Sequence, residues 1–165
     1  MRTYFILLLF LAGSLLVTPL AAQTDASGYS VMKMGSKAPP FIGFTKAGTP
    51  FTLQRAPSHC TLLAFLDPGC EWCKSLLAEL NSLKDSLGTS LRIIGITADT
   101  DSLRWNEFTS TQVPGFTFVV VSKNVLEEYK IQAAPTLYLL DKKLRIASSR
   151  LVRLPEVIDQ WEKIK

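Results

Sequence analysis

The chain has 165 residues, enough for one domain with a substantial apolar core. Lysine and arginine (18 residues) outnumber aspartate and glutamate (14 residues) only slightly, and the charges are scattered without a basic run. This balance excludes a nucleic-acid partner that binds through a basic patch, and the chain carries no internal repeat or low-complexity tract.

The first 22 residues have the form of an export signal. Arg2 supplies one positive charge, residues 5–17 form an apolar core, and the segment ending at Ala22 resembles a cleavage region. The core is short for a membrane span, so cleavage is favoured over the alternative of a retained N-terminal anchor. No cysteine closely follows the core, which argues against a lipid anchor. We therefore expect the mature protein in the periplasm or extracytoplasmic envelope.

The rest of the chain divides into a short lead-in and one domain. Residues 23–36 are expected to be a flexible lead-in, and residues 37–165 to form the folded domain. At the start of this domain, residues 41–45 and 50–53 flank a turn that contains Gly48, which indicates a β-hairpin.

The next stretch brings two cysteines to the start of a helix. Residues 61–66 are almost continuously apolar, as in a buried strand, and Asp67-Pro68-Gly69 supplies the turn that ends this strand. After Cys70-Glu71-Trp72-Cys73, apolar residues recur at the spacing of one helix face: Leu76, Leu80, Leu83 and Leu87. The cysteines are therefore predicted to open a helix that follows directly on a strand.

This placement favours thiol chemistry. The unpaired N–H groups and the positive dipole end of a helix N-terminus stabilise a thiolate over a thiol. Cys70, which is nearer the loop, is expected to be the exposed nucleophile. Cys73 lies one turn further into the helix and is expected to be the resolving thiol.

Strands and helices then continue to alternate. Strands are predicted at residues 91–97 and 116–121, because both stretches are rich in β-branched and apolar residues. Between them, Asp99-Thr100-Asp101 can cap a helix whose apolar residues are Leu103, Trp105 and Phe108.

The last part of the chain predicts a short helix, a hairpin and a closing helix. The short helix covers residues 124–129, and the hairpin pairs residues 136–140 with residues 144–149. Pro155 suits the first turn of the closing helix, whose shared apolar face is Val157, Ile158, Trp161 and Ile164. The fold class is therefore α/β, with a central mixed β-sheet flanked by helices on both faces.

Three motifs occur in a characteristic order. Gly35-Ser36-Lys37-Ala38-Pro39-Pro40-Phe41 precedes the hairpin, Cys70-Glu71-Trp72-Cys73 follows a strand, and Ala133-Ala134-Pro135-Thr136 precedes a later strand. This combination resembles the thioredoxin superfamily, and in particular its TlpA/ResA branch of envelope thiol–disulfide oxidoreductases. The resemblance implies a thioredoxin-like fold with an N-terminal β-hairpin.

The resemblance also implies roles for individual residues. Cys70 and Cys73 would form the catalytic, redox-active disulfide, and Pro135 would be a cis-proline lying against it. Trp72, Ala134 and Pro135 would belong to the groove that binds the substrate chain. No metal or cofactor is implied.

The chain departs from this family at several positions. Many thioredoxins bury an acid six residues before the nucleophile, where this chain has Ala64. Proton transfer at Cys73 must therefore use water or another group, and Glu79 on the same helix is expected to be solvated. The dipeptide between the cysteines, Glu71-Trp72, lacks the proline or histidine common in relatives. Lys142-Lys143 occupies a turn where relatives often have glycine.

A third cysteine, Cys60, precedes the strand. Together with His59 it could be considered a zinc ligand, or it could be a further redox thiol. The intervening strand separates Cys60 from the other cysteines by roughly 20 Å, too far for one zinc ion or one disulfide. We therefore expect a buried structural thiol at Cys60 and a surface residue at His59.

These observations favour an exported thiol–disulfide oxidoreductase over two alternatives. A peroxiredoxin-like peroxide reductase would need a threonine three residues before the reactive cysteine, where this chain has Asp67. A non-catalytic binding module would not need the intact cysteine pair. The expected partners are cysteine-containing envelope proteins as substrates and a membrane thiol reductase as electron donor, and the protein is expected to be monomeric. Because Asp67 and Glu71 oppose a thiolate at Cys70, the protein is expected to be a reductant or isomerase.

Overall fold

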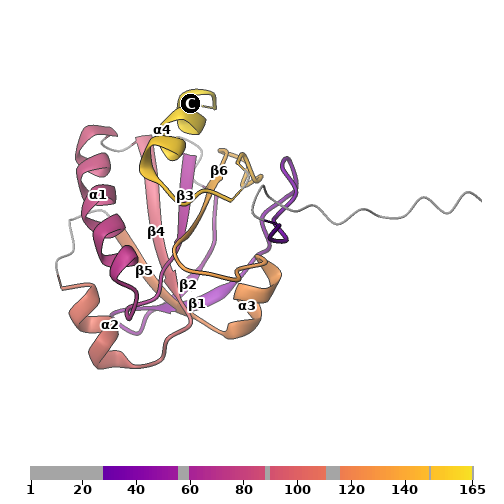
Figure 1. The fold of residues 1–165 in the computed structure, drawn as a ribbon. Coiled ribbons are helices and arrows are strands. Elements are labelled where there is room, and N and C mark those ends of the chain that lie inside the picture. The colour runs from indigo at the N-terminus through magenta and orange to yellow at the C-terminus, as the bar shows by residue number, and fades with distance from the viewer. Residues whose placement is uncertain (1–27, 56–59, 88–89, 111–115, 149, 165) are drawn as a thin grey trace, which may run out of the picture.

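The fold is built on one sheet, seen in a computed structural model that describes residues 28–55, 60–87, 90–110, 116–148 and 150–164 (Figure 1). The sheet has six strands in the order β2-β1-β5-β4-β3-β6. The strands are β1 Ile42–Thr45, β2 Pro50–Thr52, β3 Cys60–Phe65, β4 Leu91–Thr97, β5 Phe116–Val121 and β6 Thr136–Leu140. The helices are α1 Glu71–Leu87, α2 Ser102–Phe108, α3 Lys123–Glu128 and α4 Leu154–Glu162. The expected mixed α/β architecture and its N-terminal hairpin are confirmed.

Strand β3 lies between β4 and β6, and all six of its residues are buried. It pairs in parallel with β4 and antiparallel with β6, and β4 pairs in parallel with β5. The carboxyl ends of β3, β4 and β5 therefore meet at one edge of the sheet, where α1 begins and where α2 and α3 also lie (Figure 1). In open α/β sheets this edge is where ligands bind.

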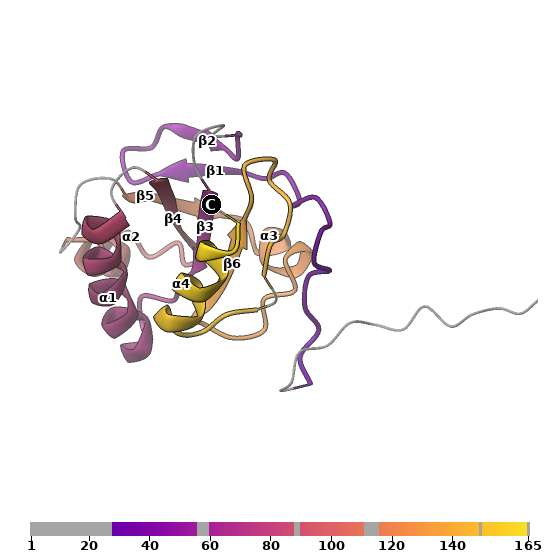
Figure 2. The ribbon, with the colours of Figure 1, turned by 90° about the horizontal axis from the view of Figure 1, so that it is seen from above.

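Each face of the sheet has its own apolar core. One core packs residues of α1, α2 and α4 against one face of the sheet, and the other includes Val125 of α3 and Tyr129 just after it on the opposite face. Figure 2 shows α1 and α4 on the same side of the sheet, with α3 on the other. Gly95 of β4 lies against the ring of Phe118, where a Cβ atom would be only 2.6 Å from the ring carbons. The close packing of β4 on β5 therefore requires glycine at this position.

Helix α2 begins at the predicted cap. The Asp101 carboxylate accepts hydrogen bonds from the backbone N–H groups of Leu103 and Arg104, which satisfies two of the free donors of the first turn. Trp105 and Phe108 are buried, whereas Leu103 is 80% exposed. Of the three apolar residues of the predicted helix, two therefore face the core and Leu103 faces solvent.

The predicted terminal hairpin has only one regular strand. After β6, the chain returns through two isolated bridges, Leu140 to Ile146 and Leu137 to Leu151. Between these bridges, the Ser148 hydroxyl accepts the hydrogen bond of the Leu139 N–H group, in place of a backbone carbonyl. This side-chain substitution interrupts the ladder, so the expected second strand at 144–149 does not form as a continuous element.

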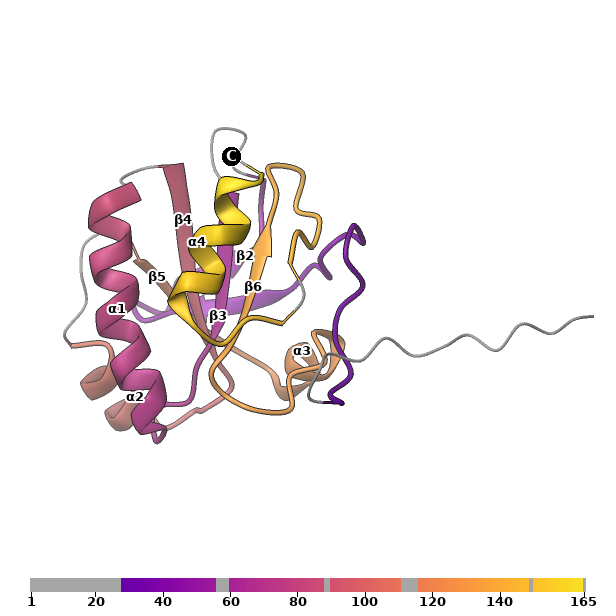
Figure 3. The same cartoon turned by 45° about the horizontal axis from the view of Figure 1, so that its top comes forward.

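The N-terminal segment is attached to the domain from residue 31 onward. Val31 is 5% exposed, its carbonyl accepts from Lys130 Nζ at 3.0 Å, and the Met32 N–H donates to the Tyr138 hydroxyl at 3.3 Å. Gly35 N–H donates to the carbonyl of Ile146. This segment, indigo in Figure 3, runs beside the chain that follows β6. Residues 31–36 of the predicted lead-in therefore contact the domain through these bonds, while the predicted signal at 1–22 lies outside the described residues.

Helix α4 closes the fold as predicted, with one exception. Val157 and Trp161 are buried and Ile164 packs against the same core, but Ile158 is 39% exposed. The helix therefore buries a narrower face than its sequence suggested. In the part of the chain that the structure describes, no helix has the length and apolar character needed to cross a membrane.

Candidate active site

The loop between β3 and α1 fixes the position of Cys70. The Asp67 carboxylate accepts from the Gly69 N–H group at 2.7 Å, and the Cys70 N–H group donates to the Asp67 carbonyl at 3.0 Å. These two bonds form a tight turn, and α1 starts at the next residue. Cys70 therefore lies immediately before the first turn of α1, at the carboxyl edge of the sheet.

Two backbone groups contact the sulfur of Cys70. The Cys73 N–H group donates to Cys70 Sγ at 3.3 Å, and Cys70 Sγ lies 3.7 Å from the carbonyl oxygen of Ala134, to which its thiol donates. The Cys73 N–H belongs to the helix N-terminus, which stabilises negative charge on sulfur. Cys70 is half-buried, so an incoming disulfide can reach it.

Cys73 has a different environment from Cys70. It is fully buried, and its sulfur accepts a hydrogen bond from the Asp67 N–H group at 3.5 Å. The pKa of the Cys73 thiol is raised to about 12, mainly by burial; the hydrogen bond from the Asp67 N–H group lowers it, and the neighbouring Cys70 and the Asp67 charge contribute to the rise. All three cysteines are free thiols here. The structure thus pairs an accessible thiol with a buried one that holds its proton strongly.

The motif at residues 133–136 lies beside Cys70, at the start of β6. The Ala134–Pro135 peptide bond is cis, and the carbonyl of Ala134 faces the sulfur of Cys70. The Thr136 hydroxyl donates to the Ala133 carbonyl at 2.7 Å and accepts from Arg150 Nε at 3.2 Å, which fixes this loop. The structure therefore brings Cys70 and Ala134, which are 64 residues apart in the sequence, into contact.

Of the other predicted residues, Trp72 points into solvent and is 73% exposed. Glu71 is also exposed, and its carboxylate pairs with the ammonium of Lys74 at 2.7 Å. Ala64 is fully buried within β3, so the place where many thioredoxins hold an acid is occupied by a methyl group.

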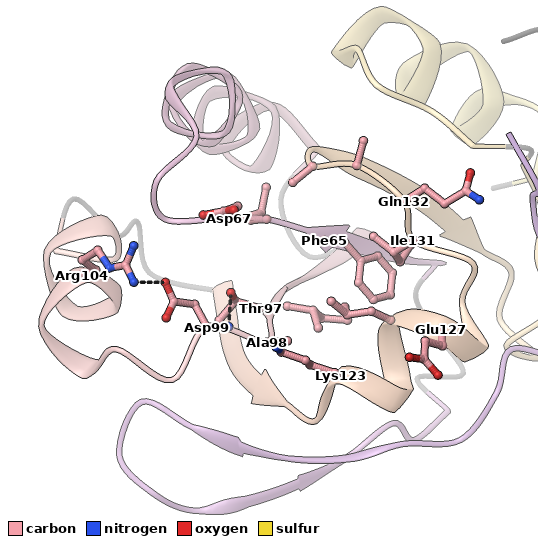
Figure 4. Close-up of a pocket in the computed structure, with 15 residues that line it drawn as sticks. Phe65, Asp67, Thr97, Ala98, Asp99, Arg104, Lys123, Glu127, Ile131 and Gln132 are labelled. Atoms are coloured by element: carbon pink, nitrogen blue, oxygen red, sulfur yellow. Dashed lines mark hydrogen bonds and ion pairs between the residues drawn. The ribbon is translucent and has the colours of Figure 1, made fainter.

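A cavity of about 680 Å³ adjoins the site beside Asp67 and Ala134 (Figure 4). Its apolar lining includes Phe65, Ile96, Leu126 and Ile131. The charged side chains that line it are Asp67, Asp99, Arg104, Lys123 and Glu127. We call this space the first cavity.

A second cavity of about 640 Å³ lies on the other side of the Pro68-Gly69 turn, between α1 and α2. Arg104 lines both cavities, and its guanidinium pairs with Asp99 at 3.3 Å and with Asp101 at 3.0 Å. Sequence reasoning missed Asp99 and Arg104, which line the first cavity together with Asp67. The available signal was the position of Asp99 just after β4, a parallel strand whose carboxyl end meets that of β3.

Cys60 lies at the opposite end of β3. It is buried, and its sulfur is 3.9 Å from the carbonyl oxygen of Ile164. Its predicted neighbour His59 lies outside the described residues. Within the described ranges, no group of three or more His, Cys, Asp or Glu residues is arranged to hold a metal ion.

Comparison with known proteins agrees with this geometry. The family model described as thioredoxin-like matches residues 58–146, more than half of the chain. The thioredoxin-like protein YneN of Bacillus subtilis (strain 168) is 25% identical over 124 residues, which cover 73% of each chain.

Two solved structures share the fold. The thioredoxin domain of a thiol-disulfide oxidoreductase from Bacteroides vulgatus superposes with a TM-score of 0.72 at 24% identity, covering 81% of this chain and 99% of that one. A peroxiredoxin-like protein from Aquifex aeolicus gives 0.69 at 14% identity, covering 82% and 89%. With the match of the family model over the cysteine motif and β3 to β6, the chain belongs to the thioredoxin-like family.

Proposed function

We propose that this protein is a thiol–disulfide oxidoreductase of the extracytoplasmic envelope, which reduces or exchanges disulfides of other proteins through Cys70 and Cys73. The observation that carries the proposal is the position of the Cys70 sulfur between the Cys73 N–H group and the Ala134 carbonyl. The first group stabilises the attacking thiolate, and the second lies where a substrate strand would pair with the protein.

The reaction has two steps. In the first, the Cys70 thiolate attacks one sulfur of a substrate disulfide, the substrate S–S bond breaks, and the departing sulfur leaves as a thiolate that takes up a proton. In the second, Cys73 loses its proton and attacks Cys70 Sγ. This attack releases the other substrate thiol and leaves a Cys70–Cys73 disulfide. Two electrons have then passed to the substrate.

Substrate binding is assigned to the surface around Cys70. Ala134 and Pro135 offer backbone groups for an extended segment, and the exposed Trp72 lies two residues after Cys70. The substrates are expected to be envelope proteins that contain cysteines. A membrane thiol reductase would return electrons to the pair after each turnover. The proposed export rests on the signal-like residues 1–22.

The direction of electron flow is expected to be reducing. The two contacts of the Cys70 sulfur are with uncharged backbone groups, and Asp67 lies three residues before Cys70 in the sequence. Strong oxidants of this kind depend on a strongly stabilised reduced form, near −120 mV, so we expect a potential nearer to about −270 mV. Equilibration with dithiothreitol measures this potential, and a value above roughly −150 mV would contradict the assignment.

The activity itself is tested by insulin reduction beside peroxide consumption. Wild-type protein should reduce insulin disulfides, Cys70→Ser should be inactive, and Cys60→Ser serves as the matched thiol control with unchanged activity. Peroxide consumption without insulin reduction would instead support the peroxiredoxin-like alternative. The absence of both activities in the wild-type protein would support a non-catalytic binding role, and full insulin reduction by Cys70→Ser would contradict the assignment of Cys70 as the nucleophile.

Cys73→Ser identifies the partners, because it stalls the reaction at the mixed disulfide. Proteins trapped on Cys70 in the native envelope would be the substrates, and a trapped membrane reductase would be the electron donor.

A further inference from the structure

The second step of the proposed reaction needs a group that takes the proton of Cys73. Only a thiolate attacks a disulfide, yet Cys73 is fully buried and its burial raises the pKa of the thiol. The carboxylate that could serve from within β3 is absent, because Ala64 occupies that position. Another group near Cys73 must therefore accept the proton.

Asp67 is the acid that the structure places at Cys73. Its N–H group donates directly to Cys73 Sγ, and its carboxylate accepts from Gly69 N–H through one oxygen, Oδ1. The residue is exposed and lines the first cavity (Figure 4). One residue thus contacts the buried sulfur through its main chain and meets solvent through its side chain.

The charges around Asp67 come from several elements. Arg104 of α2 lies close enough to interact electrostatically with Asp67, and Arg104 itself pairs with Asp99 and Asp101. Lys123 and Glu127 of α3 line the same cavity. On α1, Glu71 is paired with Lys74.

We propose that the Asp67 carboxylate accepts the proton of Cys73 when the mixed disulfide between Cys70 and substrate is resolved. The Cys73 S–H bond breaks and its proton passes to the carboxylate, through water at the exposed edge of the loop. The resulting thiolate attacks Cys70 Sγ, the bond between Cys70 and the substrate sulfur breaks, and the substrate sulfur leaves with the electron pair. Asp67 then returns its proton to solvent or to the departing thiolate.

This inference rests on the proposed function, and one experiment separates the two. Reduced protein in a Cys60→Ala background is mixed rapidly with dithiobis-nitrobenzoate, which releases one coloured thiolate when Cys70 attacks and a second when Cys73 resolves. The first phase depends on the probe concentration and the second does not. If wild-type protein gives no such second phase, the proposed function fails.

The test variant is Asp67→Asn, whose amide oxygen can still accept from Gly69 N–H and so preserves the turn. Glu71→Gln is the matched control, since it removes a carboxylate from the same motif. We expect Asp67→Asn to slow the second phase by about 100-fold between pH 6 and 8 and to leave the first phase within about twofold. Asp67→Glu should restore much of the rate, and Glu71→Gln should change neither phase.

A purely electrostatic role for Asp67 predicts the opposite sign. A negative charge near Cys73 raises the pKa of its thiol, so removing that charge would speed the second phase. If wild-type protein shows both phases and Asp67→Asn shows a second phase that is faster or unchanged, the assignment of Asp67 is overturned. Urea unfolding of each variant shows whether the fold is retained.

Discussion

The two ends of β3 carry cysteines with opposite surroundings. At the amino end, Cys60 is buried and its sulfur faces the Ile164 carbonyl, just beyond the C-terminus of α4. At the carboxyl end, Cys70 is half-buried and its sulfur accepts an N–H group at the N-terminus of α1. Helix C-termini carry partial negative charge and helix N-termini partial positive charge, so only the second place stabilises a thiolate. Helix polarity and exposure therefore make one thiol of this chain more reactive than another.

The largest expected effect is on alkylation rates. In the native reduced protein, Cys70 should react with iodoacetamide at least about 100-fold faster than Cys60 or Cys73, because both of those are buried and burial raises the pKa of each thiol. Mass spectrometry of quenched samples measures each site. Unfolding in urea should bring the three rates together. Faster labelling of Cys60 or Cys73 in the native state would contradict the assignment of Cys70 as the most reactive thiol.

The next effect concerns stability at alkaline pH. Folding raises the pKa of both Cys73 and Cys60, so above roughly pH 8.5 the unfolded chain loses thiol protons that the folded chain keeps. The free energy of unfolding should therefore be fully retained below that pH and fall as pH rises above it, by up to about 1.4 kcal/mol per pH unit for each thiol. Urea titrations of the reduced protein at neutral and alkaline pH measure this slope.

Cys60→Ala gives the control for that measurement, since it removes one of the two shifted thiols and should make the alkaline slope shallower. Equal slopes in wild type and Cys60→Ala would mean that Cys60 titrates in the folded protein as it does in the unfolded chain.

At neutral pH, Cys60→Ala tests whether the amino end of β3 affects only stability. The lost packing of a buried sulfur should cost about 1 kcal/mol of unfolding free energy. The rate of insulin reduction should stay within about twofold of wild type, because Cys60 lies at the far end of β3. A large loss of activity in the folded variant would contradict the separation of the two ends.

The smallest effect is expected from Glu71→Gln. The sequence alone suggested that Glu71 opposes a thiolate at Cys70, but its side chain is 80% exposed and paired with Lys74. Exposed charges are screened by solvent, so the alkylation rate of Cys70 should change by less than about twofold. A change of tenfold or more would restore Glu71 as a determinant of Cys70 reactivity.

The secondary structure that carries Cys70 could be predicted from the sequence, whereas several tertiary contacts around it could not. The strand, turn and helix around Cys70 could be predicted because apolar periodicity and turn residues are local signals. The placement of Arg104 between two cavities could not, since it depends on how α2 packs against α1 and the sheet. Ser148 likewise interrupts the last hairpin through a side-chain bond that periodicity does not encode.

The attachment of the N-terminal segment has a consequence for when this protein can fold. Gly35 and Ala38 donate to the carbonyls of Ile146 and Leu144, and β3 pairs with β6. A ribosome that has released only the first two thirds of the chain has therefore supplied neither the partner of this segment nor one neighbour of the central strand. Contacts so distant in sequence are slow to close. The six-stranded sheet can consequently be completed only after Leu140 has been synthesised, and the N-terminal segment can attach only after Ile146 has followed.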